Sequence, residues 1–171
     1  MGHTMVNKEN VKLRIKELID KYNKIVEEKR ISKYSEEDTK AEFIEPFFEA
    51  LGWDVRNRTH LDEVTREERV SKGRVDYGFR INGIPKFFLE AKPLKADLDK
   101  PEFAEQAINY AWHKGCTWAI LTDFEKIKVF NAEWKTTDLR QSMFFSLDSN
   151  QFLERFDQLW LLSKDSFEQD L

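Results

Sequence analysis

The chain has 171 residues, of which 40% are hydrophobic, 13% aromatic and 35% charged. This length and apolar content are those of one ordinary domain with a real core, and they exclude a disordered chain. The formal net charge of −4 argues against a stand-alone nucleic-acid binder, because neutralising phosphate needs an excess of Lys and Arg. Any contact with DNA therefore requires a local basic face or another domain.

Cysteine content and hydropathy indicate the compartment. A single cysteine, Cys116, cannot form an internal disulfide, and no cysteine spacing of the zinc type is present. No apolar run approaches the roughly 20 residues that span a bilayer, and the start of the chain lacks the apolar segment of a signal peptide. We therefore expect a cytoplasmic protein that has no membrane partner.

Helical periodicity marks the first third of the chain. From residue 11 to residue 26, apolar side chains recur every three or four residues, which predicts a helix with one buried face. Ser35 and Asp38 resemble a capping box that opens a second helix, which ends at Gly52 and is kinked at Pro46. The very polar stretch that follows, residues 59–72, is predicted to be a loop.

The remainder of the chain alternates strands and helices. Expected strands cover residues 53–57, 74–81, 84–91, 116–124 and 126–132, and expected helices cover residues 101–115 and 151–162. Asn82-Gly83, between the second and third strands, is the strongest short hairpin signal. This order predicts an α/β domain with a central mixed sheet of four to five strands flanked by helices.

Charged residues in the hairpin need an explanation, because strands disfavour charge and a buried charge must be paired or bound to a metal. Glu90 and Lys92 are two residues apart, so both project from one face of their strand. A two-residue turn would pair Asp76 with Leu89 and place Asp76 on the opposite face. We therefore predict an odd-length turn or a bulge centred on Gly83, either of which brings Asp76 to Glu90.

These three side chains suit one kind of chemistry. Two converging carboxylates offer hard oxygen ligands to a small divalent cation, and Mg²⁺ is the expected occupant. Such a cation stabilises charge that develops on a phosphate, while Lys92 can orient or activate a water, so the product would be a cut phosphodiester. The alternative is structural, with Asp76, Glu90 and Lys92 forming an ion-pair cluster in which inward charge protects a sheet edge from aggregation.

Three segments, in order, carry a family resemblance. They are SEEDTKAEFIEPFFEALGWDV at 35–55, GRVDYGF with FFLEAK within 73–92, and QAINYAWHKGCTWAILTDFEKIKVF at 106–130. Together they resemble the PD-(D/E)XK nuclease superfamily, and more closely the N-terminal nuclease domain of type IIG restriction-modification enzymes, with relatives in the type I restriction subunit. The resemblance implies a restriction-endonuclease-like fold. It also implies that Asp76, Glu90 and Lys92 are catalytic, and that Asp76, Glu90 and the main-chain carbonyl of Ala91 hold Mg²⁺.

Three further residues would have supporting roles by the same resemblance. Gln106 and Tyr110 match the family's QxxxY helix, where they would position the metal site or the DNA backbone. The alternative for this pair is a tyrosine packed on the sheet beside a surface glutamine. Glu36 matches the acidic residue of the family's first helix, which lies beside the metal or aids a water. Glu37 and Glu42 compete for that role, and acidic residues at a helix start are usually solvated.

Residues for DNA contact are sought in the charged run 62–74. Its basic members Arg66, Arg69, Lys72 and Arg74 are the candidates, although the interleaved acids suit a solvated loop equally well. In the resembled enzymes, methyltransferase and target-recognition domains grip and read double-stranded DNA, and this chain carries no methylase motif of the NPPY kind. We expect those domains on the same or a partner chain.

The sequence divides into a vector-like remnant at 1–5, an N-terminal helix and connector at 6–34, a nuclease core at 35–135, and a C-terminal helix and exit toward a following domain at 136–171. The expected function is Mg²⁺-dependent DNA hydrolysis by the nuclease domain of a IIG-like type II restriction-modification enzyme. A catalytically inactive scaffold that docks to a methyltransferase or helicase, and a repair or junction nuclease of the same superfamily, are the alternatives. One active site cuts one strand, so double-strand cleavage would need a transient dimer on DNA.

Overall fold

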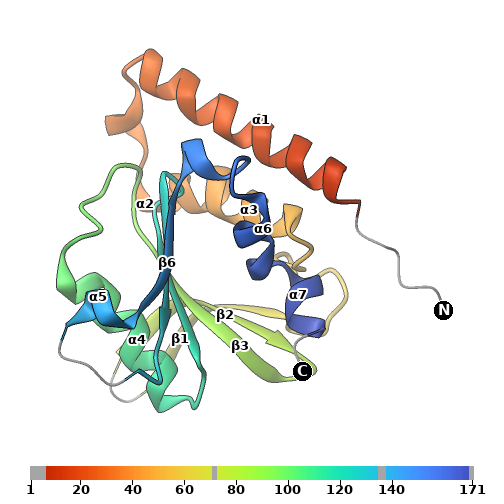
Figure 1. Ribbon diagram of the computed structural model, residues 1–171, viewed down its shortest axis with the longest axis vertical. Coiled ribbons are helices and arrows are strands. Elements are labelled where there is room, and N and C mark those ends of the chain that lie inside the picture. Colours follow the sequence, from red (N-terminus) through yellow and green to blue (C-terminus); the bar gives the residue numbers. More distant parts are fainter. Residues whose placement is uncertain (1–6, 71–72, 135–137, 170–171) are drawn as a thin grey trace.

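The computed structural model describes residues 7–70, 73–134 and 138–169, which form a six-stranded sheet with helices on both faces (Figure 1). Its strands are β1 Val64–Val70, β2 Gly73–Ile81, β3 Ile84–Ala91, β4 Trp118–Thr122, β5 Lys126–Asn131 and β6 Met143–Asp148. They lie in chain order across the sheet, with β3 and β4 parallel and the other neighbours antiparallel. The predicted mixed α/β architecture is confirmed, but the sheet has six strands rather than four to five.

Strands β1 and β6 are the ones that the prediction missed. The polar stretch predicted as a loop contains β1, which lies at the edge of the sheet and exposes Arg66 and Arg69. Charge on an edge strand blocks pairing with other molecules, so a polar sequence is compatible with a strand at this place. In β6, Phe145 and Leu147 are buried while Phe144 and Ser146 are exposed, which is the two-residue period of a half-buried strand.

The strand expected at residues 53–57 is instead a turn. The Asp54 carboxylate accepts hydrogen bonds from the backbone N–H groups of Arg58, at 2.9 Å, and Thr59, at 3.0 Å. An aspartate that binds the backbone a few residues downstream favours a turn over an extended strand. The pattern of apolar residues around Trp53 gave no sign of this competing interaction.

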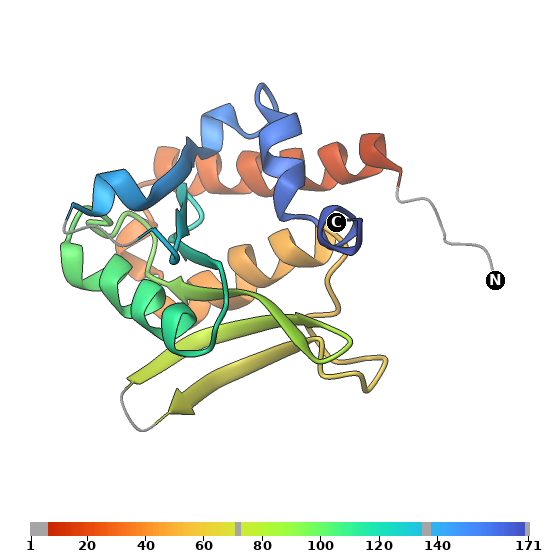
Figure 2. The same cartoon turned by 60° about the horizontal axis from the view of Figure 1, so that its bottom comes forward.

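Helices cover the two faces of the sheet (Figures 1 and 2). On one face lie α1 Lys8–Glu27, α3 Glu45–Ala50, α6 Phe156–Leu159 and α7 Lys164–Glu168, and on the other lie α4 Pro101–His113 and α5 Leu139–Ser142. Short 3-10 turns occur at Ile31–Lys33, Ser149–Gln151 and Trp160–Leu162. The single helix predicted at residues 151–162 is therefore a succession of shorter pieces.

The predicted helix after Ser35 is present but irregular. Ser35 Oγ accepts the N–H of Asp38 at 3.0 Å and the Asp38 carboxylate accepts the N–H of Ser35 at 3.1 Å, which confirms the capping box. Helix α2, Glu36–Thr39, then passes into a π-helical turn over Lys40–Ile44 before α3 begins. Pro46 stands in the first turn of α3, directly after the π turn, so the helical segment is irregular just before the proline.

The hairpin of β2 and β3 combines a two-residue turn with a bulge. Asn82 and Gly83 both have positive φ, 52° and 79°, which is typical of a type I′ turn. Beyond the turn the register shifts, with Lys86 as the extra residue, so that Tyr77 pairs with Leu89. The predicted bulge is confirmed, but it lies at Lys86 rather than at Gly83.

Aromatic packing holds the helix layer against the sheet. Phe43, Phe47, Phe124 and Phe152 form a buried cluster whose ring centroids lie 4.9 to 6.2 Å apart. Large buried rings contribute strongly to a core, so this cluster fixes the π turn and α3 against the strands. None of the helices in the described residues is long and apolar enough to cross a membrane.

Candidate active site

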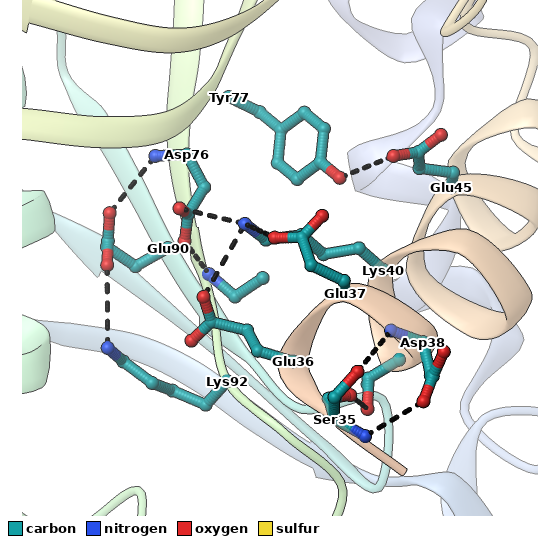
Figure 3. A network of polar contacts seen from close by, with 12 residues as sticks. Ser35, Glu36, Glu37, Asp38, Lys40, Glu45, Asp76, Tyr77, Glu90 and Lys92 are labelled. Carbon is teal, nitrogen blue, oxygen red and sulfur yellow. Dashed lines mark hydrogen bonds and ion pairs between the residues drawn. The ribbon is translucent and has the colours of Figure 1, made fainter.

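The three residues predicted to be catalytic meet where the start of β2 adjoins the end of β3 (Figure 3). Asp76 on β2 and Glu90 on β3 are both buried, with 4% and 2% of their surface exposed. Lys92 follows β3 and exposes 16% of its side chain. From the opposite side, α2 and the π turn bring Glu36 and Lys40 to the same place.

Asp76 and Glu90 are linked through the backbone of both strands. The backbone N–H of Asp76 donates to Glu90 Oε1 at 3.0 Å, and the backbone N–H of Ala91 donates to Asp76 Oδ2 at 2.8 Å. The two carboxylates therefore accept hydrogen bonds from main-chain N–H groups of the hairpin where β2 and β3 meet at the site. These contacts also orient the carboxylates, because each has one oxygen fixed by a buried donor.

Lys92 lies beside Glu90 and under helix α4. Its Nζ is 3.7 Å from Glu90 Oε2 and 4.3 Å from the centroid of the Phe103 ring. Its backbone N–H donates to the Thr122 carbonyl at 3.0 Å, which anchors the residue to the end of β4. A backbone anchor, a carboxylate and an aromatic face together hold the ammonium near the two carboxylates.

Lys40 is a member of the site that the sequence reasoning missed. Its Nζ is 3.1 Å from Asp76 Oδ1, 3.3 Å from Glu37 Oε1 and 3.5 Å from Glu36 Oε2. Burial alone would lower the pKa of Lys40, but the charge of Asp76 and the hydrogen bond to it, with smaller contributions from the two glutamates, raise that pKa. The sequence did contain an indication of this role. Lys40 follows Glu36 by four residues and Glu37 by three, so it shares a helical face with them, and that face is otherwise apolar.

Ionisation of the Glu90 carboxyl is unfavourable, because the side chain is buried beside the negative charge of Asp76. Burial, and then the charge of Asp76, raise the pKa of Glu90 to about 7, although Lys92 and the backbone hydrogen bond from Asp76 act in the opposite direction. A carboxyl in this position gains from an added positive charge. In the structure the ammonium groups of Lys40 and Lys92 supply positive charge close to the two carboxylates.

The oxygen donors at this place are compatible with Mg²⁺. Within the ranges that the structure describes, no group of three or more His, Cys, Asp and Glu side chains converges as a metal site. Asp76 and Glu90, with the Ala91 carbonyl that the family resemblance implies, offer oxygen ligands alone. Mg²⁺ suits such a set, because it binds through one or two carboxylates and keeps waters or phosphate oxygens in its remaining positions.

The predicted QxxxY pair lies on α4 and contacts the first two strands. Gln106 Nε2 donates to the Arg74 carbonyl at 2.9 Å, two residues before Asp76. The Tyr110 hydroxyl donates to Glu68 Oε2 at 3.0 Å, which, after burial, contributes to raising the pKa of Tyr110 to about 12. These contacts make Gln106 a support of β2 beside the site, and they tie Tyr110 to β1.

Of the three acidic candidates on the first helix segment, two reach the site. Glu36 and Glu37 both contact Lys40, and the Glu36 side chain is the less exposed of the two, at 32% against 78%. Glu42 points elsewhere, accepting hydrogen bonds from Lys21 at 2.9 Å and the Tyr34 hydroxyl at 3.2 Å. The structure thus places Glu36 next to the carboxylate pair through Lys40.

The predicted DNA-contacting residues lie on β1 and β2. Arg66 is half exposed and donates to Glu45 Oε1 at 2.7 Å. Arg69 and Arg74 are exposed and directly paired across the two strands. Like charges in such a pair repel one another, so an anion between them is favourable. Lys72 falls outside the described residues.

Comparisons with known proteins agree on one class. Residues 60–138 match the family model described as type I restriction enzyme R protein N terminus, HSDR_N. The chain is 27% identical over 164 residues to the type II restriction enzyme and methyltransferase RM.Eco57I of Escherichia coli, a match that covers 88% of this chain and 16% of that protein.

A solved structure adds a likeness of fold. It is described as a fragment of an HsdR subunit of a type I restriction enzyme from Vibrio vulnificus YJ016, and it matches with a TM-score of 0.50 at 20% sequence identity. The match covers 72% of this chain and 25% of that one. The chain thus spans a quarter or less of either relative.

Proposed function

We propose, from the confirmed resemblance of this chain to the N-terminal domains of restriction enzymes, that it is the Mg²⁺-dependent endodeoxyribonuclease domain of a IIG-like type II restriction-modification enzyme. The observation that carries the proposal is the buried pair of Asp76 and Glu90 with the Lys92 ammonium 3.7 Å from Glu90. These residues correspond to the Asp, Glu-x-Lys set that the resemblance to the PD-(D/E)XK superfamily implies, and the bulged hairpin brings them together.

Each residue has a role in this proposal. Asp76, Glu90 and the main-chain carbonyl of Ala91 would hold Mg²⁺. When bound, the cation supplies positive charge against the phosphate and makes water more acidic. Lys92 donates hydrogen bonds from its ammonium, which can orient the attacking water and offset charge on the phosphate oxygens. Its contact with Phe103 keeps the ammonium near Glu90 before DNA arrives.

The proposed substrate is double-stranded DNA that is held mainly by other domains. The paired Arg69 and Arg74 on the sheet edge are the local contact that we expect for a phosphate. The net charge of −4 leaves too little attraction for tight independent binding. Methyltransferase and target-recognition domains, on the same or a partner chain, would supply the grip and the sequence readout, and double-strand cleavage would need two copies on the DNA.

One observation favours the catalytically inactive scaffold as a second candidate. Lys40 already places an ammonium 3.1 Å from Asp76, so the charged cluster can be stable without a metal. In that case the fold would serve to dock a methyltransferase or helicase. The two candidates differ in the role of Lys92, which acts on a water or a phosphate in the nuclease and only neutralises Glu90 in the scaffold.

Plasmid cleavage distinguishes the two functions. Supercoiled DNA is incubated with excess protein in Mg²⁺ or in EDTA, using wild type, Asp76→Asn and Lys92→Met, with the exposed Lys16→Met as a matched loss of charge on α1. The nuclease proposal expects Mg²⁺-dependent nicking that falls by about 100-fold or more in the two site variants and is unchanged in the control. Absence of Mg²⁺-dependent nicking by wild type, or equal nicking by all four proteins, would favour the scaffold.

A further inference from the structure

Lys40 is a buried ammonium that contacts three carboxylates at once. Its side chain is 8% exposed, and Nζ lies between Asp76 Oδ1, Glu37 Oε1 and Glu36 Oε2 at 3.1, 3.3 and 3.5 Å (Figure 3). A lysine loses hydration when it is buried, so this position is stable only because its partners are charged. Asp76 is the partner that is itself buried, with 4% of its side chain exposed.

The backbone beneath Lys40 is fixed from two directions. Thr39 is fully buried; its Oγ1 donates to the Ser35 carbonyl at 2.8 Å and accepts the N–H of Leu94 at 3.2 Å. Lys40 is also the first residue of the π turn, a local departure from α-helix that often occurs at functional sites. These contacts aim the side chain at Asp76, in contrast to a surface ion pair whose two partners are free to move.

We propose that Lys40 is a positioning residue that acts as the internal counter-ion of the metal-free site. It neutralises Asp76 and competes with a divalent cation for Asp76 Oδ1. The inference rests on the proposed function, since it takes Asp76 to be a cation ligand. Two consequences follow. First, Lys40 weakens the affinity of the site for the cation. Second, when the cation replaces the Lys40 ammonium at Asp76, that ammonium stays within reach of Glu36 and Glu37, so no buried charge is left unpaired.

Mg²⁺ alone, without DNA, is the probe for this competition. Calorimetric titration compares wild type with Lys40→Met, Lys40→Arg and a matched control, Lys21→Met, which removes a half-exposed ammonium bonded to Glu42. Removing a positive charge that touches a ligand should tighten Mg²⁺ binding by about 10-fold or more in Lys40→Met. Lys40→Arg keeps the charge and Lys21→Met removes one outside the site, so both should stay near the wild-type affinity.

Thermal unfolding supplies a second readout on the same proteins. In EDTA, Lys40→Met should melt below wild type, because Asp76 loses its counter-ion, and saturating Mg²⁺ should remove most of that difference. Equal or weaker Mg²⁺ affinity in Lys40→Met, or a loss of stability that Mg²⁺ does not reverse, would show that Lys40 is only a structural ion pair and would overturn the inference.

Should Lys40→Met fail to fold, the wild-type protein still provides a test. The ¹⁵N signal of the Lys40 ammonium should shift as Mg²⁺ is added, and it should be displaced in Asp76→Asn before any Mg²⁺ is present. A signal that stays fixed at saturating Mg²⁺ overturns the inference. Plasmid nicking that remains Mg²⁺-dependent in that case leaves the nuclease proposal intact, whereas absence of nicking by a protein whose Lys40 signal does shift with Mg²⁺ counts against the nuclease proposal alone.

Discussion

Asp76 on β2 is hydrogen-bonded to both Glu90 and Ala91 on β3: its N–H donates to Glu90 Oε1 at 3.0 Å, and its Oδ2 accepts the N–H of Ala91 at 2.8 Å. The carboxylates therefore complete the pairing of β2 with β3 as well as offering ligands. A substitution that keeps an acceptor at either position has a different structural effect from one that removes it. This distinction determines which variants report on chemistry.

Asp76→Ala should cost far more stability than Asp76→Asn. Alanine leaves the Ala91 N–H without its acceptor and the buried Lys40 without its main partner, and such a loss costs about 3 kcal/mol or more. Asparagine keeps the acceptor and should cost about 1 kcal/mol. Urea unfolding in EDTA, followed by circular dichroism, measures both. Equal losses in the two variants would mean that the Asp76 side chain does not hold the hairpin.

Glu90→Gln should stabilise the metal-free protein at high pH. The raised pKa of Glu90 means that the folded state holds a proton that the unfolded state releases above its ordinary pKa of 4.5. The free-energy cost of ionising Glu90 in the folded protein is therefore absent below about pH 4.5. This cost grows up to the folded pKa of about 7 and is complete above it. Urea unfolding in EDTA at pH 8 should show a gain of about 1 kcal/mol or more for Glu90→Gln, and at pH 4.5 the two proteins should coincide.

The same variant should lose cation binding, and Asp123→Asn provides the comparison. Asp123 is also buried, and burial, followed by the charge of Glu125, raises its pKa to about 7, from 3.8, although the N–H of Lys126 donates to it. Asp123→Asn should therefore show a similar gain in unfolding free energy above pH 7. It should leave Mg²⁺ affinity unchanged, since Asp123 caps the β4–β5 turn. A matching loss of Mg²⁺ binding in both variants would place the cation elsewhere.

Tyr110→Phe should affect stability and leave the site intact. The variant removes the hydroxyl that donates to Glu68, and the loss of one such hydrogen bond to a charged group costs about 1.5 to 3 kcal/mol. Mg²⁺ affinity and plasmid nicking, measured below the melting temperature of the variant, should match wild type. A drop in nicking of 10-fold or more at full stability would instead support the role implied by the family resemblance, in which Tyr110 positions the site or the DNA.

Much of the fold was predictable where the sequence pattern is local. The capping box at Ser35, the Asn82-Gly83 turn and the helix after Pro101 depend on neighbouring residues, and each is present. β1 was not predictable by the same means, because an edge strand rich in charge has the composition of a loop. The turn at Asp54 was missed because side-chain hydrogen bonds override the apolar pattern.

The hairpin half of the candidate site was predictable from the residues themselves, whereas Glu36, on the helix side, was named only through the family resemblance. The requirement that Asp76 share a face with Glu90 led to the prediction of a bulge, and the bulge exists, at Lys86 instead of Gly83. Either position satisfies the same parity, so the sequence could not choose between them. Lys40, by contrast, lies in the π turn that follows α2, 36 residues before Asp76 in the chain. Contacts over such separations depend on how α2 packs on the sheet, which no local pattern encodes.

The central claim, that Asp76 and Glu90 hold Mg²⁺ for DNA cleavage, is tested most directly by calorimetric titration of Mg²⁺ into the protein bound to a short, uncleavable DNA duplex. Wild type is compared with Asp76→Asn and Glu90→Gln, and circular dichroism checks that all three share one fold. We predict binding heat in wild type that disappears in both variants. Indistinguishable titrations of the three proteins would contradict the claim and would leave the charged cluster as a structural feature of the sheet.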